Sequence, residues 1–296
     1  RYVMAQPNID IHHRAEELAA GLPPLLVAAE RVATTVSQGV HGRRRVGQGE
    51  SFWQYRHYGI GDSAQLIDWR QSARSDHVYV RENEWEAAQS VWLWRDGSNS
   101  MQYRSDDALP TKRERTDLLL LAVASLLVRG GEFVALLGSG RSPSTGRATL
   151  NQLATLFDHD DTPHVSVPSY ELIARYARVV MIGDFLSPLE EIKPVIEAYS
   201  TQGIRGHMVQ VLDPAEEALP FEGRVRFEGM ENEGGVLIGR TESVRDEYQE
   251  VLDLHNEGLK ALCASAGWSF AQHRTDHAPE PALLALFMLL SQPVGS

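Results

Sequence analysis

The amino-acid sequence predicts an α/β fold, in which a mostly parallel sheet carries helices on both faces, with a helical and irregular extension at the N-terminus. Two observations support this prediction. Continuous apolar runs of strand length recur from residue 88 onward, and segments with helical periodicity separate them. Strands that are apolar along their whole length are typical of parallel sheets, because helices cover both faces of such a sheet.

The first three predicted strands alternate with helices. Residues 88–95 form the first apolar run, and residues 111–131 form a helix that a pair of glycines closes. Residues 132–139 predict a second strand, which is followed by a short helix at 149–157. The third strand, at 177–184, ends in an aspartate. This alternation predicts the strand-helix-strand connections of a parallel sheet.

The second half of the chain continues the alternation. Ser187 can cap the next helix and Pro188 suits its first turn, because that turn needs no backbone donor at the proline. The remaining elements are, in order, a helix at 187–203, a strand at 204–213, a hairpin within 222–239, a long helix at 242–265, a strand at 268–274 and a last helix at 281–290.

Three regions differ in composition. Residues 1–40 are rich in alanine and leucine with helical spacing, and two prolines at 23–24 predict a break before a longer helix from about Leu25. Residues 41–87 are rich in arginine, acidic and aromatic residues and show little periodicity. Residues 88–296 carry the alternating pattern. We therefore expect an N-terminal helical segment, a charged and aromatic extension, and one α/β domain.

Composition and charge exclude several classes of protein. The chain has 296 residues and a formal net charge of −12, which argues against a nucleic-acid-binding protein. A single cysteine, Cys263, excludes an internal disulfide framework and a cysteine-rich zinc site. No apolar run reaches the roughly 18 to 20 residues that span a bilayer. The sequence has no phosphate-binding loop of the Walker type, so we expect no nucleotide, and we expect a cytoplasmic protein without direct membrane insertion.

Two predicted strands end in side chains that carry oxygen ligands. Asp96, Ser98 and Ser100 follow the first strand at alternate positions, and Asp184 ends the third strand. Ligands of open parallel sheets bind beyond the carboxyl ends of the strands, so these side chains should share one edge if the two strands are neighbours. Two carboxylates and two hydroxyls suit a hard cation such as Mg²⁺. The alternative is structural, with the same residues capping turns and the following helices.

The string DGSNSM after an apolar strand resembles the metal-ion-dependent adhesion site of von Willebrand factor A domains. The segment before it, from RRRVGQGE to NEWEAAQS, resembles the signature of a bacterial family that is still called a domain of unknown function, number fifty-eight. Members of that family resemble von Willebrand A domains and are often encoded beside MoxR-type AAA+ ATPases. The residues that carry the signature are Asp62, Asp68, Trp69, Arg74, Arg81 and Glu82.

The resemblance implies a cation site of Asp96, Ser98, Ser100 and Asp184, filled by Mg²⁺ or by Mn²⁺ or Ca²⁺. A von Willebrand A domain adds a threonine from the loop before its second helix. Arg147 falls about where that threonine belongs, and Thr145 or Thr149 could substitute for it. We therefore place Thr149 among the candidate ligands and expect Arg147 and Asn99 to modulate the site or contact a partner. An arginine there could replace the cation or bind the anion that the cation would recruit.

These observations favour a non-enzymatic, cytoplasmic protein-interaction module. The resemblance implies that it acts as an adaptor or co-chaperone for a MoxR-type AAA+ ATPase and binds a partner carboxylate through the cation. One alternative is a structural or regulatory subunit without metal. Another is a metal-dependent phosphoryl-transfer enzyme, but Ser98 stands where such an enzyme needs a second acid. The charged residues of 41–87 either hold that extension together or form a docking surface.

Overall fold

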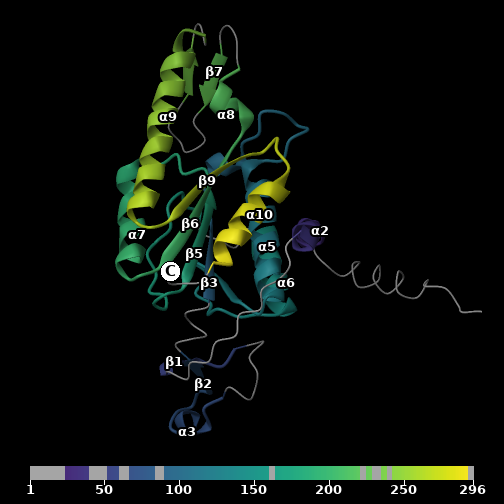
Figure 1. Ribbon diagram of the computed structural model, residues 1–296, viewed down its shortest axis with the longest axis vertical. Helices are drawn as coiled ribbons and strands as arrows, with labels where there is room; N and C mark the ends of the chain where they lie inside the picture. Colours follow the sequence, from purple (N-terminus) through teal and green to yellow (C-terminus); the bar gives the residue numbers. More distant parts are fainter. Residues whose placement is uncertain are drawn as a thin grey trace, which may run out of the picture.

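A five-stranded parallel sheet forms the centre of the fold in the computed structural model (Figure 1). Its strands are β3 (Ser90–Arg95), β4 (Phe133–Leu136), β5 (Arg178–Gly183), β6 (Arg205–Leu212) and β9 (Ser269–Arg274). They lie in the order β4-β3-β5-β6-β9, and every neighbouring pair is parallel. The prediction of an α/β fold with a mostly parallel sheet is confirmed.

The structure describes residues 24–39, 52–59, 67–83, 90–159, 164–220, 225–228, 235–238 and 242–292. Asp62 of the predicted signature lies outside these ranges. Arg81 and Glu82 lie on a described strand, but their side chains are outside the description.

Helices cover both faces of the sheet, as the apolar strands predict (Figure 1). One face carries a hydrophobic cluster to which α2 (Pro24–Gly39), α5 (Lys112–Arg129), α6 (Arg147–Asp158) and α10 (Pro279–Leu290) contribute. The other face carries a second cluster, to which α7 (Leu189–Thr201) and α9 (Glu242–Ser265) contribute. The strands are buried between these two layers.

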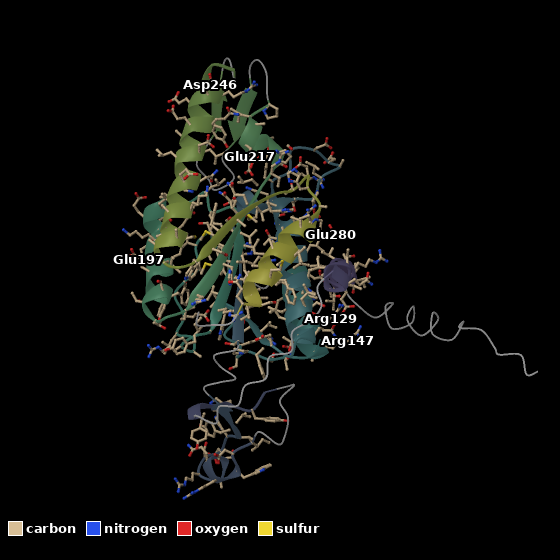
Figure 2. All side chains as sticks on the ribbon, in the orientation of Figure 1. Arg129, Arg147, Glu197, Glu217, Asp246 and Glu280 are labelled. Atoms are coloured by element: carbon tan, nitrogen blue, oxygen red, sulfur yellow. The ribbon has the colours of Figure 1, made fainter. Side chains whose placement is uncertain are left out.

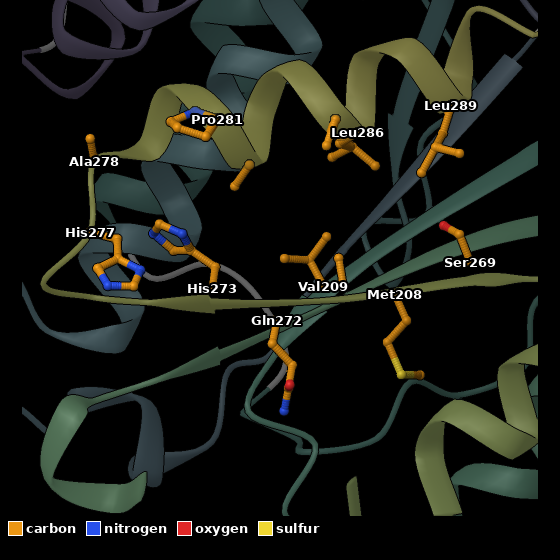
Figure 3. A pocket seen from close by; sticks show the side chains of 13 residues that line it. Met208, Val209, Ser269, Gln272, His273, His277, Ala278, Pro281, Leu286 and Leu289 are labelled. Carbon is orange, nitrogen blue, oxygen red and sulfur yellow. The ribbon is translucent and has the colours of Figure 1, made fainter. Parts of the chain in front are cut away.

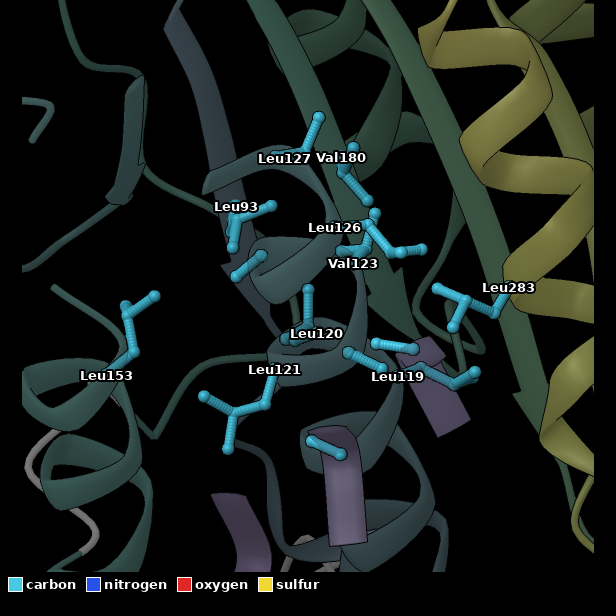
Figure 4. Packing of buried hydrophobic residues seen from close by; sticks show 14 of the residues in the cluster. Leu93, Leu119, Leu120, Leu121, Val123, Leu126, Leu127, Leu153, Val180 and Leu283 are labelled. Atoms are coloured by element: carbon cyan, nitrogen blue, oxygen red, sulfur yellow. The ribbon is translucent and has the colours of Figure 1, made fainter. Parts of the chain in front are cut away.

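Helix α5 lies at the centre of the first cluster. All of its residues from 119 to 127 are buried, so this helix is apolar all round rather than on one face. Figure 4 shows its side chains among Leu93 and Val180 of the sheet, Leu153 of α6 and Leu283 of α10. This packing explains the unbroken apolar run in this helix, because each side of the helix has a protein neighbour.

Helix α2 belongs to the same hydrophobic cluster. It begins with Pro24, close to the position predicted for the longer N-terminal helix. Leu26, Ala29 and Ala33 are fully buried within the cluster that α5 organises. The change in composition near residue 40 therefore does not mark a boundary between two hydrophobic cores.

The extension contains a pair of strands that its sequence pattern did not indicate. β1 (Phe52–His57) and β2 (Tyr79–Asn83) pair antiparallel, and the short helix α3 (Trp69–Ser72) lies between them in the chain. Asp68 caps α3, since its Oδ1 accepts hydrogen bonds from the backbone amides of Arg70 and Gln71. Among the signature side chains that the structure describes, Asp68 thus has a local structural role.

Two other signature residues of the extension are exposed. Trp69 is 67% exposed and Arg74 also lies at the surface. Neither is part of either hydrophobic cluster. Exposure of a tryptophan is compatible with the docking-surface alternative for this extension, whereas the cap at Asp68 supports the structural one.

The N-terminal caps of two helices differ from the sequence analysis. The cap predicted for α7 is wrong, and the cap of α5 was not predicted. α7 begins at Leu189 with Pro188 as its N-cap, so the predicted cap by Ser187 is wrong. Glu190 and Glu191 lie in the first turn instead, where negative charge interacts favourably with the helix dipole. α5 begins with a capping box, in which the Thr111 hydroxyl accepts from the Glu114 amide at 3.1 Å.

The region between β6 and β9 contains the remaining elements. The predicted hairpin is present as β7 (Val225–Glu228) and β8 (Gly235–Ile238), which pair antiparallel. The short helix α8 (Pro214–Ala218) precedes the hairpin and α9 follows it. Of the helices that the structure describes, none combines the length and apolarity needed to cross a membrane.

His207 of β6 is buried in its neutral form. It is 8% exposed, and its Nδ1 lies 2.8 Å from the Ser269 hydroxyl on β9. Burial, together with the positive charges of Arg178 and Arg205, lowers its pKa from 6.5 to about 4. The unfolded chain takes up this proton near pH 6.5 and the folded chain takes it up only near pH 4. The stability that depends on neutral His207 is therefore complete above pH 6.5 and is lost as the pH falls toward 4.

Replacing His207 by glutamine should reduce this pH dependence. Between about pH 7 and about pH 4.5, the wild type should lose about 2–3 kcal/mol more unfolding free energy than His207→Gln. Urea unfolding at both pH values measures the difference. The exposed His159, replaced by glutamine, is the control and should behave as wild type. Equal losses in the wild type and His207→Gln would contradict the prediction.

Candidate functional site

The candidate site lies where the strand order reverses. From β3 the chain crosses to β4 on one side, whereas β5, β6 and β9 follow on the other side. The helices that leave β3 and β5 therefore lie on opposite faces and open a crevice beyond the carboxyl ends of these strands. Asp96 follows β3 and Asp184 follows β5, and the backbone amide of Asp96 donates to Ile182 O at 3.0 Å. The two carboxylates thus lie on one edge of the sheet.

Four of the side chains proposed from the sequence form one connected cluster. Oδ1 of Asp96 accepts from the backbone amide and the hydroxyl of Ser98, at 3.0 and 2.5 Å. The hydroxyls of Ser98 and Ser100 lie 2.9 Å apart, and the Ser100 hydroxyl donates to Oδ2 of Asp184 at 2.6 Å. We call Asp96, Ser98, Ser100 and Asp184 the rim cluster. It places two carboxylates and two hydroxyls within contact of one another.

The rim cluster buries more negative charge than the protein neutralises. Asp96 is 0% and Asp184 is 1% exposed. Burial, together with the charge of Asp184, raises the pKa of Asp96 to about 7. Among the described residues, no cationic side chain forms an ion pair with Asp96. A buried carboxylate without a counter-charge is costly, so the site favours either a proton or a cation at this position.

Lys112 is the residue of this site that the sequence analysis missed. It is the first residue of α5 and is fully buried, and its Nζ lies 2.8 Å from Asp184 Oδ2 and 2.6 Å from Glu216 Oε1. Burial alone would raise the pKa of Asp184, but the charge and hydrogen bonds of Lys112, with the Ser100 hydroxyl, hold it below its usual range. Helical side chains lean toward the N-terminus of their helix, so a lysine at this position reaches the rim. The position of Lys112 at the start of the helix that follows Asp96 was therefore the signal in the sequence that could have identified it.

The backbone beside Asp184 leaves room for Asp96. A Cβ added at Gly183 would lie 2.6 Å from the Asp96 Cβ, so only glycine permits this approach. Phe185, directly after Asp184, has a φ of +50° and is buried. Its carbonyl lies 2.7 Å from Nε2 of His255 on α9, which helps to hold this unusual conformation. The close approach of β3 and β5 at the rim thus depends on special backbone positions.

The remaining contacts fix the ends of both strands. Arg95 donates to both carboxylate oxygens of Asp117 on α5, at 3.3 and 3.2 Å, and this pair is buried. The amide of Gly97 donates to Val165 O at 3.1 Å, which brings the segment after α6 to the rim. Gln210 of β6 donates to the carbonyl of Asp184 at 2.9 Å. The ends of β3 and β5 that carry the rim cluster are therefore held by contacts to three other parts of the fold.

Thr149 does not lie at the rim, and its proposed role as a cation ligand is wrong. Its hydroxyl lies 2.9 Å from that of Ser144, which pairs with Val134 of β4. Val134 lies opposite Val91, which precedes Asp96 by five residues. At about 3.3 Å per residue along a strand, this level is about 16 Å from the rim.

Arg147 is also misplaced by the sequence interpretation. It is exposed and begins α6 near the level of Ser144. Figure 2 shows it beside Arg129 in the lower part of the α/β domain, whereas Glu217, the chain neighbour of Glu216, lies in the upper part. α6 runs toward the rim, because the Phe157 ring near its end lies 5.1 Å from the Arg95 guanidinium. The motif comparison assumed that the start of α6 faced the site, whereas the segment after its end does. Asn99, by contrast, is exposed directly beside Ser98 and Ser100.

The rim cluster has the donor chemistry of a hard-cation site. All its side-chain donors are oxygens, as Mg²⁺ prefers, and Asp96 has charge that no described side chain matches. Among the described residues, no group of three or more histidine, cysteine or acidic side chains could hold a metal. A cation here would therefore depend on Asp96, Asp184, the two hydroxyls and water. Lys112 competes for one of these oxygens.

A separate pocket of about 390 Å³ lies between β9 and α10 (Figure 3). Its walls are mostly apolar, with Val209, Leu286 and Leu289 among them. His273 lines it and lies 2.9 Å, through Nε2, from a guanidinium nitrogen of Arg115. Because arginine only donates, Nε2 accepts and the ring is neutral, in agreement with a pKa lowered to about 4 by burial and by Arg115. The pocket has no paired carboxylates, so its chemistry differs from that of the rim.

Comparisons with known proteins identify a family. A family model described as "Protein of unknown function DUF58" matches residues 54–258. Uncharacterized proteins of Mycobacterium tuberculosis and Mycobacterium bovis are 26% identical over 278 residues, which cover 88% of this chain and 86% of each relative. Among solved structures, the conserved hypothetical protein BatB from Bacteroides thetaiotaomicron aligns with a TM-score of 0.41 and 13% identity. An aerotolerance-related membrane protein from Bacteroides fragilis aligns with 0.39 and 17%. Each alignment covers 68% of this chain and 98% of the other.

Replacing Gly183 by alanine should displace Asp96. The added methyl group would overlap the Asp96 side chain, so we expect the unfolding free energy to fall by about 1–3 kcal/mol. Urea unfolding measures this loss. Gly130→Ala is the control, because Gly130 has an α-helical conformation and its added Cβ would meet two carbonyl oxygens at 3.2 and 3.6 Å, with no side chain nearby. Equal effects of the two substitutions would contradict the close approach at the rim.

Proposed function

Because the chain belongs to the DUF58 family, whose model matches residues 54–258, we propose that it is a non-enzymatic protein-interaction module. In this proposal the rim cluster holds a divalent cation and binds a carboxylate of a partner protein. The observation that carries the proposal is the buried pair of Asp96 and Asp184, beside two hydroxyls and with one carboxylate unmatched by any described cation. Mg²⁺ is the preferred occupant, and Mn²⁺ or Ca²⁺ would use the same donors.

The type of α/β fold is also inferred. We propose a von Willebrand factor A-like fold, supported by the doubly wound order of the parallel sheet and by the rim cluster at its reversal point. An antiparallel bridge between Val134 and Ser144 extends the β4 edge of this sheet. The Asp-x-Ser-x-Ser string directly after the first strand of the sheet agrees with the same assignment.

The chain's own residues would position the cation and leave one side of it open. A bound divalent cation would offer a coordination position to a partner's carboxylate oxygen. The Ser98 and Ser100 hydroxyls are held toward Asp96 and Asp184 by the contacts of the rim cluster, so these two hydroxyls need to move little to bind a cation. Exposed Asn99 lies next to the hydroxyls and would contact the partner.

The same geometry argues against catalysis. The residue two positions after Asp96 is Ser98, and a hydroxyl 2.5 Å from Asp96 cannot serve as the general acid of a phosphoryl-transfer reaction. A phosphoryl-transfer enzyme remains the least favoured alternative.

The partner and the location are inferred from the resemblance to the family. We propose a cytoplasmic adaptor or co-chaperone that acts with a MoxR-type AAA+ ATPase. An acidic residue of that ATPase, or of its client, would bind at the rim cluster. The chain's own net charge of −12 makes a bridging cation more important for such a contact, because two acidic surfaces otherwise repel.

One observation favours a second candidate function, a structural or regulatory subunit without metal. The buried ammonium of Lys112 already neutralises Asp184, so the rim could be stable without a divalent ion. In that case Asp96 would carry a proton near neutral pH, in agreement with its raised pKa of about 7. Partner binding would then be independent of divalent cations.

Mn²⁺ titration of the full chain, followed by electron paramagnetic resonance, separates these candidates. The wild type should bind one Mn²⁺, and Asp96→Asn should weaken binding by about tenfold or more, because a charged ligand is lost. Asp107→Ala is the control, since this exposed carboxylate is outside the rim cluster. Capture of the purified MoxR-type ATPase should require Mg²⁺ and be lost in Asp96→Asn. Capture that survives both chelation and this substitution would reject the cation-dependent interaction.

A further inference from the structure

Lys112 places a positive charge beside the rim cluster, in addition to the divalent cation proposed there. It is fully buried, and its ammonium lies between Asp184 and Glu216, at 2.8 and 2.6 Å. Two carboxylates within hydrogen-bond distance of one ammonium favour its charged form, although burial opposes it. The charged ammonium is therefore part of the electrostatics of the rim cluster.

The charges around Lys112 are not balanced. With Asp96 ionised, Asp96, Asp184 and Glu216 carry three negative charges and Lys112 carries one positive charge, which leaves two negative charges. This remainder equals the charge of one divalent cation. The site is thus compatible with Lys112 and a divalent ion together, provided that the ammonium does not hold the oxygens that the ion needs.

Lys112 and a divalent ion would compete for a single oxygen, Oδ2 of Asp184. Asp184 Oδ2 accepts from the Ser100 hydroxyl at 2.6 Å and from Lys112, whereas Oδ1 accepts from the Leu186 amide at 3.2 Å. A cation that uses Asp184 and Ser100 has to displace or repel the ammonium. Like charges a few ångströms apart in a buried site repel strongly, so Lys112 opposes the binding of any divalent ion.

Glu216 gives the ammonium an alternative partner. Its carboxylate is held by α8, because Oε2 accepts from the Asp213 amide at 2.9 Å while Oε1 accepts from Lys112. Its carbonyl accepts from the Tyr248 hydroxyl of α9 at 2.7 Å. Lys112 can therefore leave Asp184 without becoming an unpaired buried charge, because Glu216 is fixed in place to receive it.

We propose that Lys112 is a tethered counter-cation that sets the affinity of the rim cluster for divalent ions, and that Glu216 is the anchor that holds the ammonium when such an ion binds at Asp184. This inference rests on the proposed function for the identity of the rim cluster as a cation site. It makes Lys112 and Glu216 positioning residues, which act through Asp184 and touch neither the cation nor the partner. The rim cluster thereby binds divalent ions more weakly than its four oxygen side chains alone would.

Mn²⁺ titrations at about pH 8 of the wild type, Lys112→Met and Glu216→Gln, each as the whole 296-residue chain, test this inference. Removing the ammonium should tighten Mn²⁺ binding by about tenfold to a hundredfold, since it removes a nearby like charge. Removing the Glu216 charge should weaken binding by about tenfold, because Lys112 then has only Asp184 as its partner. Opposite signs exclude general damage to the fold, which would weaken binding in both variants.

Two controls and a double variant separate the anchor role of Glu216 from a general effect of charge on Mn²⁺ affinity. Lys193→Met and Glu217→Gln make the same charge changes at surface pairs outside the rim and should leave Mn²⁺ affinity within about twofold of wild type. If Glu216 acts through Lys112, the effect of Glu216→Gln should largely vanish in the Lys112→Met background. Additive effects in the double variant would overturn the anchor role. Lys112→Gln, which keeps a hydrogen-bond donor, replaces Lys112→Met if the latter does not fold.

The outcomes distinguish this inference from the proposed function. If the wild type binds Mn²⁺ and Lys112→Met binds it no more tightly, the counter-cation role is overturned and the cation-dependent function stands. If only the Lys112 variants bind, the counter-cation role holds and the native rim is metal-free. If neither the wild type nor any Lys112 variant binds Mn²⁺, both the cation site and the counter-cation role are rejected.

Discussion

The burial of two carboxylates, Asp96 and Asp184, at the ends of adjacent parallel strands is the constraint on which the rest of this structure depends. The parallel order of the sheet brings them together, and Gly183 allows strands β3 and β5 to approach closely enough. Two buried like charges are unfavourable unless cations, protons or hydrogen bonds compensate them. Lys112 compensates Asp184, and the hydroxyls of the rim cluster connect the two carboxylates. The charge of Asp96 is the part that no described cation compensates.

Much of the fold was predictable from the sequence because each strand and helix is specified locally. The apolar strands, the glycine stop after α5 and the hairpin all have short-range signals, and the rule for parallel sheets then placed Asp96, Ser98, Ser100 and Asp184 on one edge. The strands of the extension were missed because each is only five or six residues long and lies in a segment of mixed charged and aromatic composition. The Ser187 cap was wrong because α7 begins one residue later than its sequence suggests.

The errors at the site arose from long-range geometry. Lys112 and Glu216 are 104 residues apart in the chain, and no local pattern indicates that they form an ion pair. Thr149 was assigned by motif spacing, which does not specify the edge of the sheet from which a helix starts. The antiparallel pairing of Ser144 with Val134 returns the chain to the far edge before α6 begins. Only the topology shows that the segment after α6, through Val165, reaches Gly97.

The central claim is that the rim cluster is a cation site whose affinity Lys112 limits. A crystal structure with Mn²⁺, located by its anomalous signal, tests this claim most directly. The account predicts one peak in direct contact with the hydroxyl oxygens of Ser98 and Ser100, with the Lys112 ammonium moved from Asp184 toward Glu216. An empty rim at saturating Mn²⁺, with Lys112 still bound to Asp184, would contradict it.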